Sequence, residues 1–186
     1  MLNLKDVDGF SNGDMVILFD GTQFIETGEY DSTLLKSNKF GTLLWAKAFR
    51  RDRGILSTML DMVVYNDTVI WVHGWMTSVK TSSYIGLFDT NGNNVYSYSI
   101  GSPYFFNNWI SYGFVPLSNS SFVYTYVADP TENRQNISSS TTYDFAIAMG
   151  EFNTTITNQT IAYNVVIDFG NAKDYPWKLA KGNYSL

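Results

Sequence analysis

The single histidine is the first residue to consider for chemistry. His73 lies in the segment Trp71-Val72-His73-Gly74-Trp75, and strand alternation places Trp71, His73 and Trp75 on one face. Histidine is the side chain that most often carries protons in catalysis. Two interpretations stay open, a His that contacts a ligand in an aromatic pocket and a His that is packed in, or exposed at the edge of, a sheet. With one His and no Cys in the chain, most nucleophilic and acid–base mechanisms lack a proton carrier, and no catalytic residue is predicted.

A second candidate site is an acidic segment near the start of the chain. Asp6, Asp8 and Asp14 occupy positions one, three and nine of the segment 6–14, with a glycine between them. Carboxylate oxygens wrapped around a short turn are suitable ligands for a hard cation. The segment resembles the calcium loops of integrin-type propeller repeats, which implies calcium as the one expected cofactor. The alternative is that Asp and Gly simply make turns, so that 6–13 is a turn-rich start before the first strand.

Asparagine glycosylation is the third kind of chemistry. The chain has six Asn-x-Ser/Thr triplets, and each accepts an N-glycan if the chain passes through a secretory pathway. All six lie near expected strand ends or in polar gaps, where a glycan would project into water. The acceptors are Asn66, Asn119, Asn136, Asn153, Asn158 and Asn183. Polar loop residues without a glycan are the alternative interpretation.

Aromatic residues are the remaining candidates for binding. Rings beside Asn can stack on sugars or anchor a subunit contact, whereas in a core they fill the space between sheets. The core is the favoured place for Trp71, while the segment 104–109 suits either a core or a contact with an interface or a ligand. The candidates for ligand or interface contacts are Trp71, Trp75, Tyr104, Trp109 and Trp177.

The elements that must position these residues repeat along the chain. An apolar strand occurs three times, about 53 residues apart, at 14–19, 67–72 and 121–126. Each copy is followed by a turn and a second strand, at 40–45, 91–96 and 158–163. A period near 50 residues without helices is typical of propeller blades or stacked β-units, which must pack on neighbours.

The repeat predicts an all-β chain of antiparallel four-stranded units. We expect a single domain, 1–186, built of the units 1–53, 54–108 and 109–170 with a C-terminal tail 171–186. The expected strands are 14–19, 32–38 and 42–49, then 57–65, 68–76, 83–88 and 94–100, then 110–117, 121–128, 142–149 and 159–168. The segment 43–49 is the best helix candidate, but it repeats a strand position and is expected to be a strand.

Two segments carry a resemblance to a known class of repeats. The stretches 41–49 and 84–101 resemble the β-propeller repeats of bacterial, archaeal and protist proteins, in which an Asp-x-x-Gly-Asn turn, here 89–93, joins two strands. The third unit departs from the pattern, since Asn153-Thr154-Thr155 replaces its glycine turn. The resemblance implies a partial propeller-like fold and an extracellular setting, and no activity. Closed propellers usually have about four to eight blades, so three units imply a piece of a longer protein, subunits that complete one another, or a β-sandwich with fortuitous periodicity.

Composition narrows the function. The 186 residues are 45% apolar and 17% aromatic, which is enough for one domain with a core. A net charge of −5 argues against nucleic-acid partners, because phosphate contacts need clustered Lys and Arg. No apolar run reaches the roughly 20 residues of a membrane helix. The chain also starts without a signal-peptide pattern, so either it is not secreted as written or it is a mature or excised segment.

The function expected from these features is non-catalytic. We predict an N-glycosylated structural protein of the cell surface or extracellular space. Its partners would be copies of itself or another domain of a longer protein, in a filament, sheath or coat. The alternatives are a glycan- or protein-binding propeller-like module and a viral structural protein, with a hydrolase the least supported.

Overall fold

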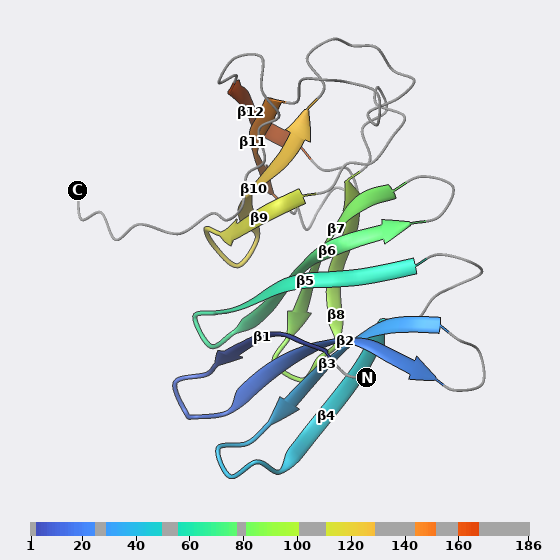
Figure 1. Cartoon of the computed structure of the whole chain (residues 1–186). Helices are drawn as coiled ribbons and strands as arrows, with labels where there is room; N and C mark the ends of the chain where they lie inside the picture. Colours follow the sequence, from blue (N-terminus) through green and yellow to red (C-terminus); the bar gives the residue numbers. More distant parts are fainter. Residues whose placement is uncertain are drawn as a thin grey trace. The chain divides into compact units, whose positions relative to one another are not determined.

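The protein is all-β, as expected. The computed structural model describes residues 3–24, 29–49, 56–77, 81–100, 111–128, 144–151 and 160–167. Within these ranges every regular element is a strand, and the strands form antiparallel sheets of four (Figure 1). No helix in the described part of the chain is long and apolar enough to cross a membrane.

Each sheet is a meander in which every strand pairs with its neighbours in sequence. The first sheet contains β1 (Asn3–Gly9), β2 (Met15–Phe24), β3 (Glu29–Ser37) and β4 (Leu43–Phe49). The second contains β5 (Leu56–Tyr65), β6 (Val69–Thr77), β7 (Thr81–Asp89) and β8 (Asn94–Ile100). The third contains β9 (Ser111–Pro116), β10 (Ser121–Ala128), β11 (Asp144–Glu151) and β12 (Thr160–Ile167). The repeated apolar strand corresponds to β2, β6 and β10, so the repeat in the sequence is a repeat of four-stranded units.

The start of the chain is the main correction to the expected elements. The segment 6–13 was expected to be turn-rich, but residues Asn3–Gly9 form β1, in which Val7 pairs with Ile17 of β2. Aspartates at alternating positions place their carboxylates on one face of a strand and leave the intervening Val7 on the other. The Asp and Gly content hides this period of two. The expectation for 43–49 is confirmed, since it forms β4.

Three hairpins use the same five-residue turn. In Phe10–Asp14, Asn38–Thr42 and Asp89–Asn93, the first N–H donates to the fifth carbonyl, at 2.8, 2.9 and 2.9 Å. The fourth residue of each is a glycine with positive φ. The β5–β6 hairpin instead has Asn66 and Asp67 at φ 49° and 56°, the signs that a type I′ turn requires. The turns expected at Asn66-Asp67 and Asn91-Gly92 are therefore confirmed.

The chain divides into two compact units, 1–101 and 102–186. The first unit holds the first two sheets, which pack face to face around one hydrophobic core. The second unit holds the third sheet, where Phe122 lies between Phe114 and Tyr124 with ring centroids 5.8 and 5.9 Å apart. The loop at 130–140 and the tail 171–186 lie outside the described residues.

Candidate functional site

The first sheet has two apolar faces with different surroundings. Along β2, Val16 and Leu18 are fully buried, whereas the alternating residues Met15, Ile17 and Phe19 are not. The buried pair belongs to the core shared with the second sheet, so we call this the inner face. The opposite face, which carries Met15, Ile17 and Phe19, is called the outer face.

The inner face meets the second sheet through an apolar centre. Leu34 of β3 joins Val16 and Leu18, and all three are fully buried. From the second sheet, Ile70 and Val72 pack into the same cluster and are also fully buried. Each such aliphatic side chain contributes about 1.5–3 kcal/mol when it is removed from water. The centre of this junction is therefore an ordinary hydrophobic core.

Carboxylates close the side of this junction where β1 lies against β5. Oδ2 of Asp6 accepts a hydrogen bond from the N–H of Met62 at 3.0 Å, and Oδ2 of Asp8 accepts one from Val64 at 2.7 Å. Both donors belong to β5, which lies at the edge of the second sheet and, among the described strands, pairs with β6 alone. An exposed edge is a template for unwanted pairing, and side-chain acceptors that occupy its N–H groups remove that hazard. Asp6 and Asp8 therefore cap an edge strand.

A second strand of the first sheet adds to this cap. Oγ of Ser32, in β3, accepts a hydrogen bond from the N–H of Met59 at 2.8 Å. Both residues are buried. Three N–H groups along β5 thus find side-chain acceptors in the first sheet, which ties the register of one sheet to that of the other.

A buried lysine of the first sheet reaches across to a hairpin turn of the second sheet. Lys36 Nζ lies 4.1 Å from the ring centroid of Phe10 and 3.6 Å from Oδ2 of Asp14. It also donates to the carbonyl of Thr90, in the β7–β8 turn, at 3.4 Å. The charge is thus held by a π face, a carboxylate and a carbonyl, as burial of an ammonium group requires. The carboxylate of Asp14 thus forms an ion pair with Lys36, a side chain of its own sheet.

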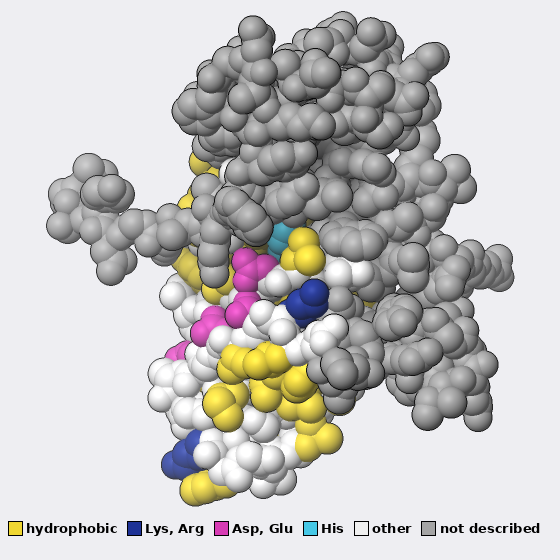
Figure 2. Space-filling view, viewed as in Figure 1, with side chains coloured by type: hydrophobic (Ala, Val, Ile, Leu, Met, Phe, Trp, Pro, Cys, Tyr) yellow, Lys and Arg dark blue, Asp and Glu magenta, His cyan; other side chains and the backbone are white. Residues whose placement is uncertain are grey.

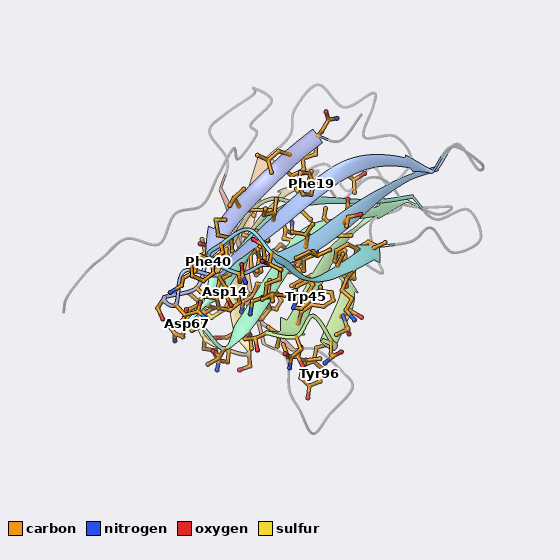
Figure 3. All side chains as sticks on the ribbon, turned by 90° about the horizontal axis from the view of Figure 1, so that it is seen from below. Asp14, Phe19, Phe40, Trp45, Asp67 and Tyr96 are labelled. Atoms are coloured by element: carbon orange, nitrogen blue, oxygen red, sulfur yellow. The ribbon has the colours of Figure 1, made fainter. Side chains whose placement is uncertain are left out.

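Trp45 clamps the same turn of the second sheet. Its Nε1 donates to the carbonyl of Thr90 at 3.1 Å. A Cβ placed on Gly92 would approach the Trp45 ring to 3.0 Å, so the indole lies directly against a residue that has no side chain. Figure 3 labels Trp45 on β4, between the strands of the two sheets. The Gly of the Asp-x-x-Gly-Asn turn therefore serves both the turn and the packing of the sheets.

The hairpin ends are joined by one further bond. The N–H of Ser11 donates to Oδ1 of Asp67 at 2.8 Å, which links the β1–β2 turn to the β5–β6 turn. The hydrogen bonds from the Ser11 side chain and backbone hold the pKa of Asp67 below its usual value. Figure 3 shows Asp14, Phe40 and Asp67 gathered at this end of the strands, with Phe19 farther along β2.

The outer face of the first sheet is apolar and exposed. Val7 keeps 46% of its surface exposed, Leu4 59%, Met15 38% and Leu44 49%, values far above those of the inner face. Figure 2 shows hydrophobic side chains gathered over the first sheet on one side of the molecule. A contiguous exposed apolar patch of this kind usually marks an interaction surface.

His73 and Trp71 are deeply buried in β6. Trp71 is fully buried and His73 retains 1% exposure. Burial lowers the pKa of His73 to about 4, so the imidazole is neutral at pH 7. Burial likewise raises the pKa of Tyr84 to about 12, against the opposing effect of its hydrogen bonds with Ser97 and Asn94. Neither His73 nor Tyr84 is charged at neutral pH, and Trp71 presents no surface to solvent.

The predicted glycosylation sites divide between described and undescribed residues. Asn66 lies in the exposed β5–β6 turn and Asn119 in the exposed β9–β10 turn. Both positions suit an acceptor, and their modification stays a prediction. The other acceptors lie outside the described residues: Asn136, Asn153, Asn158 and Asn183.

The other predicted site residues are only partly brought together. Asp6, Asp8 and Asp14 lie along one junction, but their carboxylates bond to backbone N–H groups, to Lys36 and to Asn12. Among the described residues, no group of three or more His, Cys, Asp or Glu side chains has the arrangement of a metal site. Calcium binding stays a prediction, and the described residues do not form a coordination shell for it. The backbone of Trp75 lies in β6, whereas Tyr104, Trp109 and Trp177 lie outside the described residues.

Sequence reasoning missed the residues that join the sheets. Ser32, Lys36 and Trp45 were not singled out as site residues, and the acidic pair of β1 was assigned to a cation. The available signal was the alternation Asp6-Val7-Asp8, which is strand-like. Comparison with known proteins adds no identification, since the chain matches no protein-family profile and no curated protein.

Proposed function

We propose that this chain is a non-catalytic structural subunit of the cell surface or extracellular space that assembles through its β-sheets. The observation that carries the proposal is the outer face of the first sheet, where apolar side chains stay exposed while the inner face is fully used in packing. Repeated β-units bury their faces by stacking, and a face without a neighbour is completed by another sheet. The fold proposed for the whole is an incomplete propeller, supported by the meanders of four strands and by the face-to-face packing of the first two sheets.

The site chemistry supports a structural role over catalysis. The polar groups of the described junction are used to hold two sheets together, through the carboxylates of Asp6 and Asp8 and the ammonium group of Lys36. The neutral, buried His73 is poorly placed to exchange protons with a substrate. Exposed sequons at Asn66 and Asn119 agree with an extracellular setting.

The test of this proposal is the mass of the native protein in solution. Light scattering after size-exclusion chromatography, at about 1–100 µM, should show a species larger than 21.1 kDa that grows with concentration. A monodisperse monomer over the whole range contradicts the proposal. Intact-mass analysis of protein secreted from eukaryotic cells should show glycan mass, and its loss in an Asn66→Gln, Asn119→Gln variant would assign two sites.

A further inference from the structure

The outer face of the first sheet is built of two cross-strand rows. In the first row, Ile17 of β2 lies between Val7 of β1 and Leu35 of β3. In the second row, Phe19 pairs with Leu4 of β1. Residues paired across antiparallel strands point to the same side of the sheet, so these side chains form one continuous apolar surface.

The second sheet repeats both rows on the face that it turns to the first sheet. Ile70 lies between Val64 of β5 and Phe88 of β7, and Val72 pairs with Met62. The repeat in the sequence, with its period of about 53 residues, places Ile70 at the position of Ile17 and Val72 at that of Phe19.

Equivalent rows in the two sheets have opposite surroundings. Ile70 and Val72 are fully buried because the inner face of the first sheet covers them. The equivalent rows of the first sheet leave Val7 46% and Leu4 59% exposed. The outer face thus has the side-chain pattern of a sheet face that packs on another sheet. The equivalent face of the second sheet has such a neighbour, whereas the outer face of the first sheet is exposed.

We infer that the outer face of the first sheet packs against the same face of a second copy of this chain. This inference rests on the proposed function and specifies its contact. The inner face of a second copy's first sheet is already covered by its own second sheet, whereas its outer face is exposed and carries the same apolar rows. Two identical faces related by a two-fold axis form an isologous contact, the commonest kind in homo-oligomers.

Charge limits which faces of two copies can meet. The chain carries a net charge of −5, so two copies repel each other over most of their surfaces. The side chains named on the outer face are uncharged, and two such faces can meet without burying an unpaired charge. Flat rows of aliphatic and aromatic side chains suit the aligned packing of two sheets about 10 Å apart.

The decisive variants place a charge on the outer face. Val7→Glu and Leu44→Glu change side chains that are about half exposed in the single chain, so the fold should tolerate them. In the assembly each puts carboxylates into an apolar contact, and the dissociation constant should rise at least about tenfold. The matched control is Phe40→Glu, the same kind of change at an 81% exposed residue in the β3–β4 turn. Its association should stay as in the native chain.

A second measurement, chemical crosslinking, does not require the fold to tolerate an introduced charge. The native chain has no cysteine, so single-cysteine variants report only the position chosen. Val7→Cys, Met15→Cys and Leu44→Cys should give covalent dimers with a short bis-maleimide at low protein concentration, and Phe40→Cys should not. An unchanged circular dichroism spectrum should accompany each variant.

The outcomes separate this inference from the broader proposal. Loss of association in the outer-face variants, with the control unaffected and the expected crosslinks formed, supports the inference. Native association that survives Val7→Glu and Leu44→Glu, without crosslinks at the three cysteines, overturns the inference and leaves self-assembly standing. A native chain that stays monomeric overturns both.

Discussion

The first two sheets share one repeat, yet they differ in how many faces are covered. In the second sheet, Ile70 and Val72 on one face and Trp71 and His73 on the other are all buried. In the first sheet the inner face is buried, whereas Met15 on the outer face keeps 38% exposure. Because the two sheets have apolar cross-strand rows at equivalent positions, the difference lies in their neighbours. An apolar pattern on both faces of a strand indicates that two neighbours are required, and the first sheet has one in its own unit.

The difference in burial between the two sheets is tested most directly by truncating one isoleucine in each sheet, at equivalent positions. Ile70→Ala should lower the free energy of unfolding by about 2–5 kcal/mol, since it opens a cavity in a closed core. Ile17→Ala, at the equivalent position on the outer face, should cost under about 1.5 kcal/mol in a dilute monomer. Urea unfolding of both variants measures the difference. Equal losses in the dilute monomer would show that the outer face is closed within a single chain.

The burial of the other face of the second sheet, which carries His73, can be tested by varying the pH. Burial lowers the pKa of folded His73 to about 4, whereas an unfolded histidine titrates near 6.5, so the unfolded chain takes up the proton first as the pH falls. The stability associated with neutral His73 is therefore complete above pH 6.5 and is lost as the pH falls to 4. Since a tenfold change in proton affinity is about 1.4 kcal/mol, the loss is on the order of 3 kcal/mol.

The measurement compares the native chain with His73→Gln in urea at pH 7 and at pH 4.5. Carboxylate titration affects both proteins alike, so the difference between them isolates His73. The gap in stability should shift in favour of the variant at the lower pH. A pH-independent gap would mean that the imidazole is reached by solvent and that this face is not closed.

Removal of an edge cap tests the polar part of the junction. Asp8→Ala leaves the N–H of Val64 without the acceptor that it has at 2.7 Å, and the cost should be about 1–3 kcal/mol. Asp8→Asn keeps an acceptor oxygen and should recover most of this loss. Thermal unfolding of both variants, with and without calcium, also tests the alternative role. A stabilisation by calcium that Asp8→Asn abolishes would favour a cation site over a cap.

The smallest expected effect separates two roles of a turn glycine. Gly92 and Gly41 have φ of 76° and 82°, so alanine should cost about 1 kcal/mol at either position. Only at Gly92 would the added Cβ meet the Trp45 ring, at 3.0 Å, whereas Gly41 has open space. Gly92→Ala should therefore be the more destabilising of the two in urea unfolding. Equal losses of stability in the two variants would show that the Trp45 ring moves aside at no measurable cost.

Periodicity made the fold class predictable, and it failed where composition masked it. The strands β6 and β10 lie close to the expected positions because their apolar runs are bounded by turn residues. β1 was missed because Asp6, Asp8 and Gly9 read as turn formers, although their alternation is that of a strand. Oδ1 of Asp6 and Asp8 accepts the N–H of the next residue, but Oδ2 of each finds its donor only when β5 lies beside β1. No local pattern states which strand that will be.

The sequence by itself determined most of the strands, their turns and the three-fold repeat. These depend on alternation, glycine at positive φ and short-range hydrogen bonds, all of which act over a few residues. Only the tertiary structure decided that Lys36, Trp45 and the β1 aspartates join two sheets, and that the outer rows of the first sheet stay exposed while equal rows of the second are buried. Burial depends on which faces meet across long separations in the chain, and rows that are equally apolar leave that choice open.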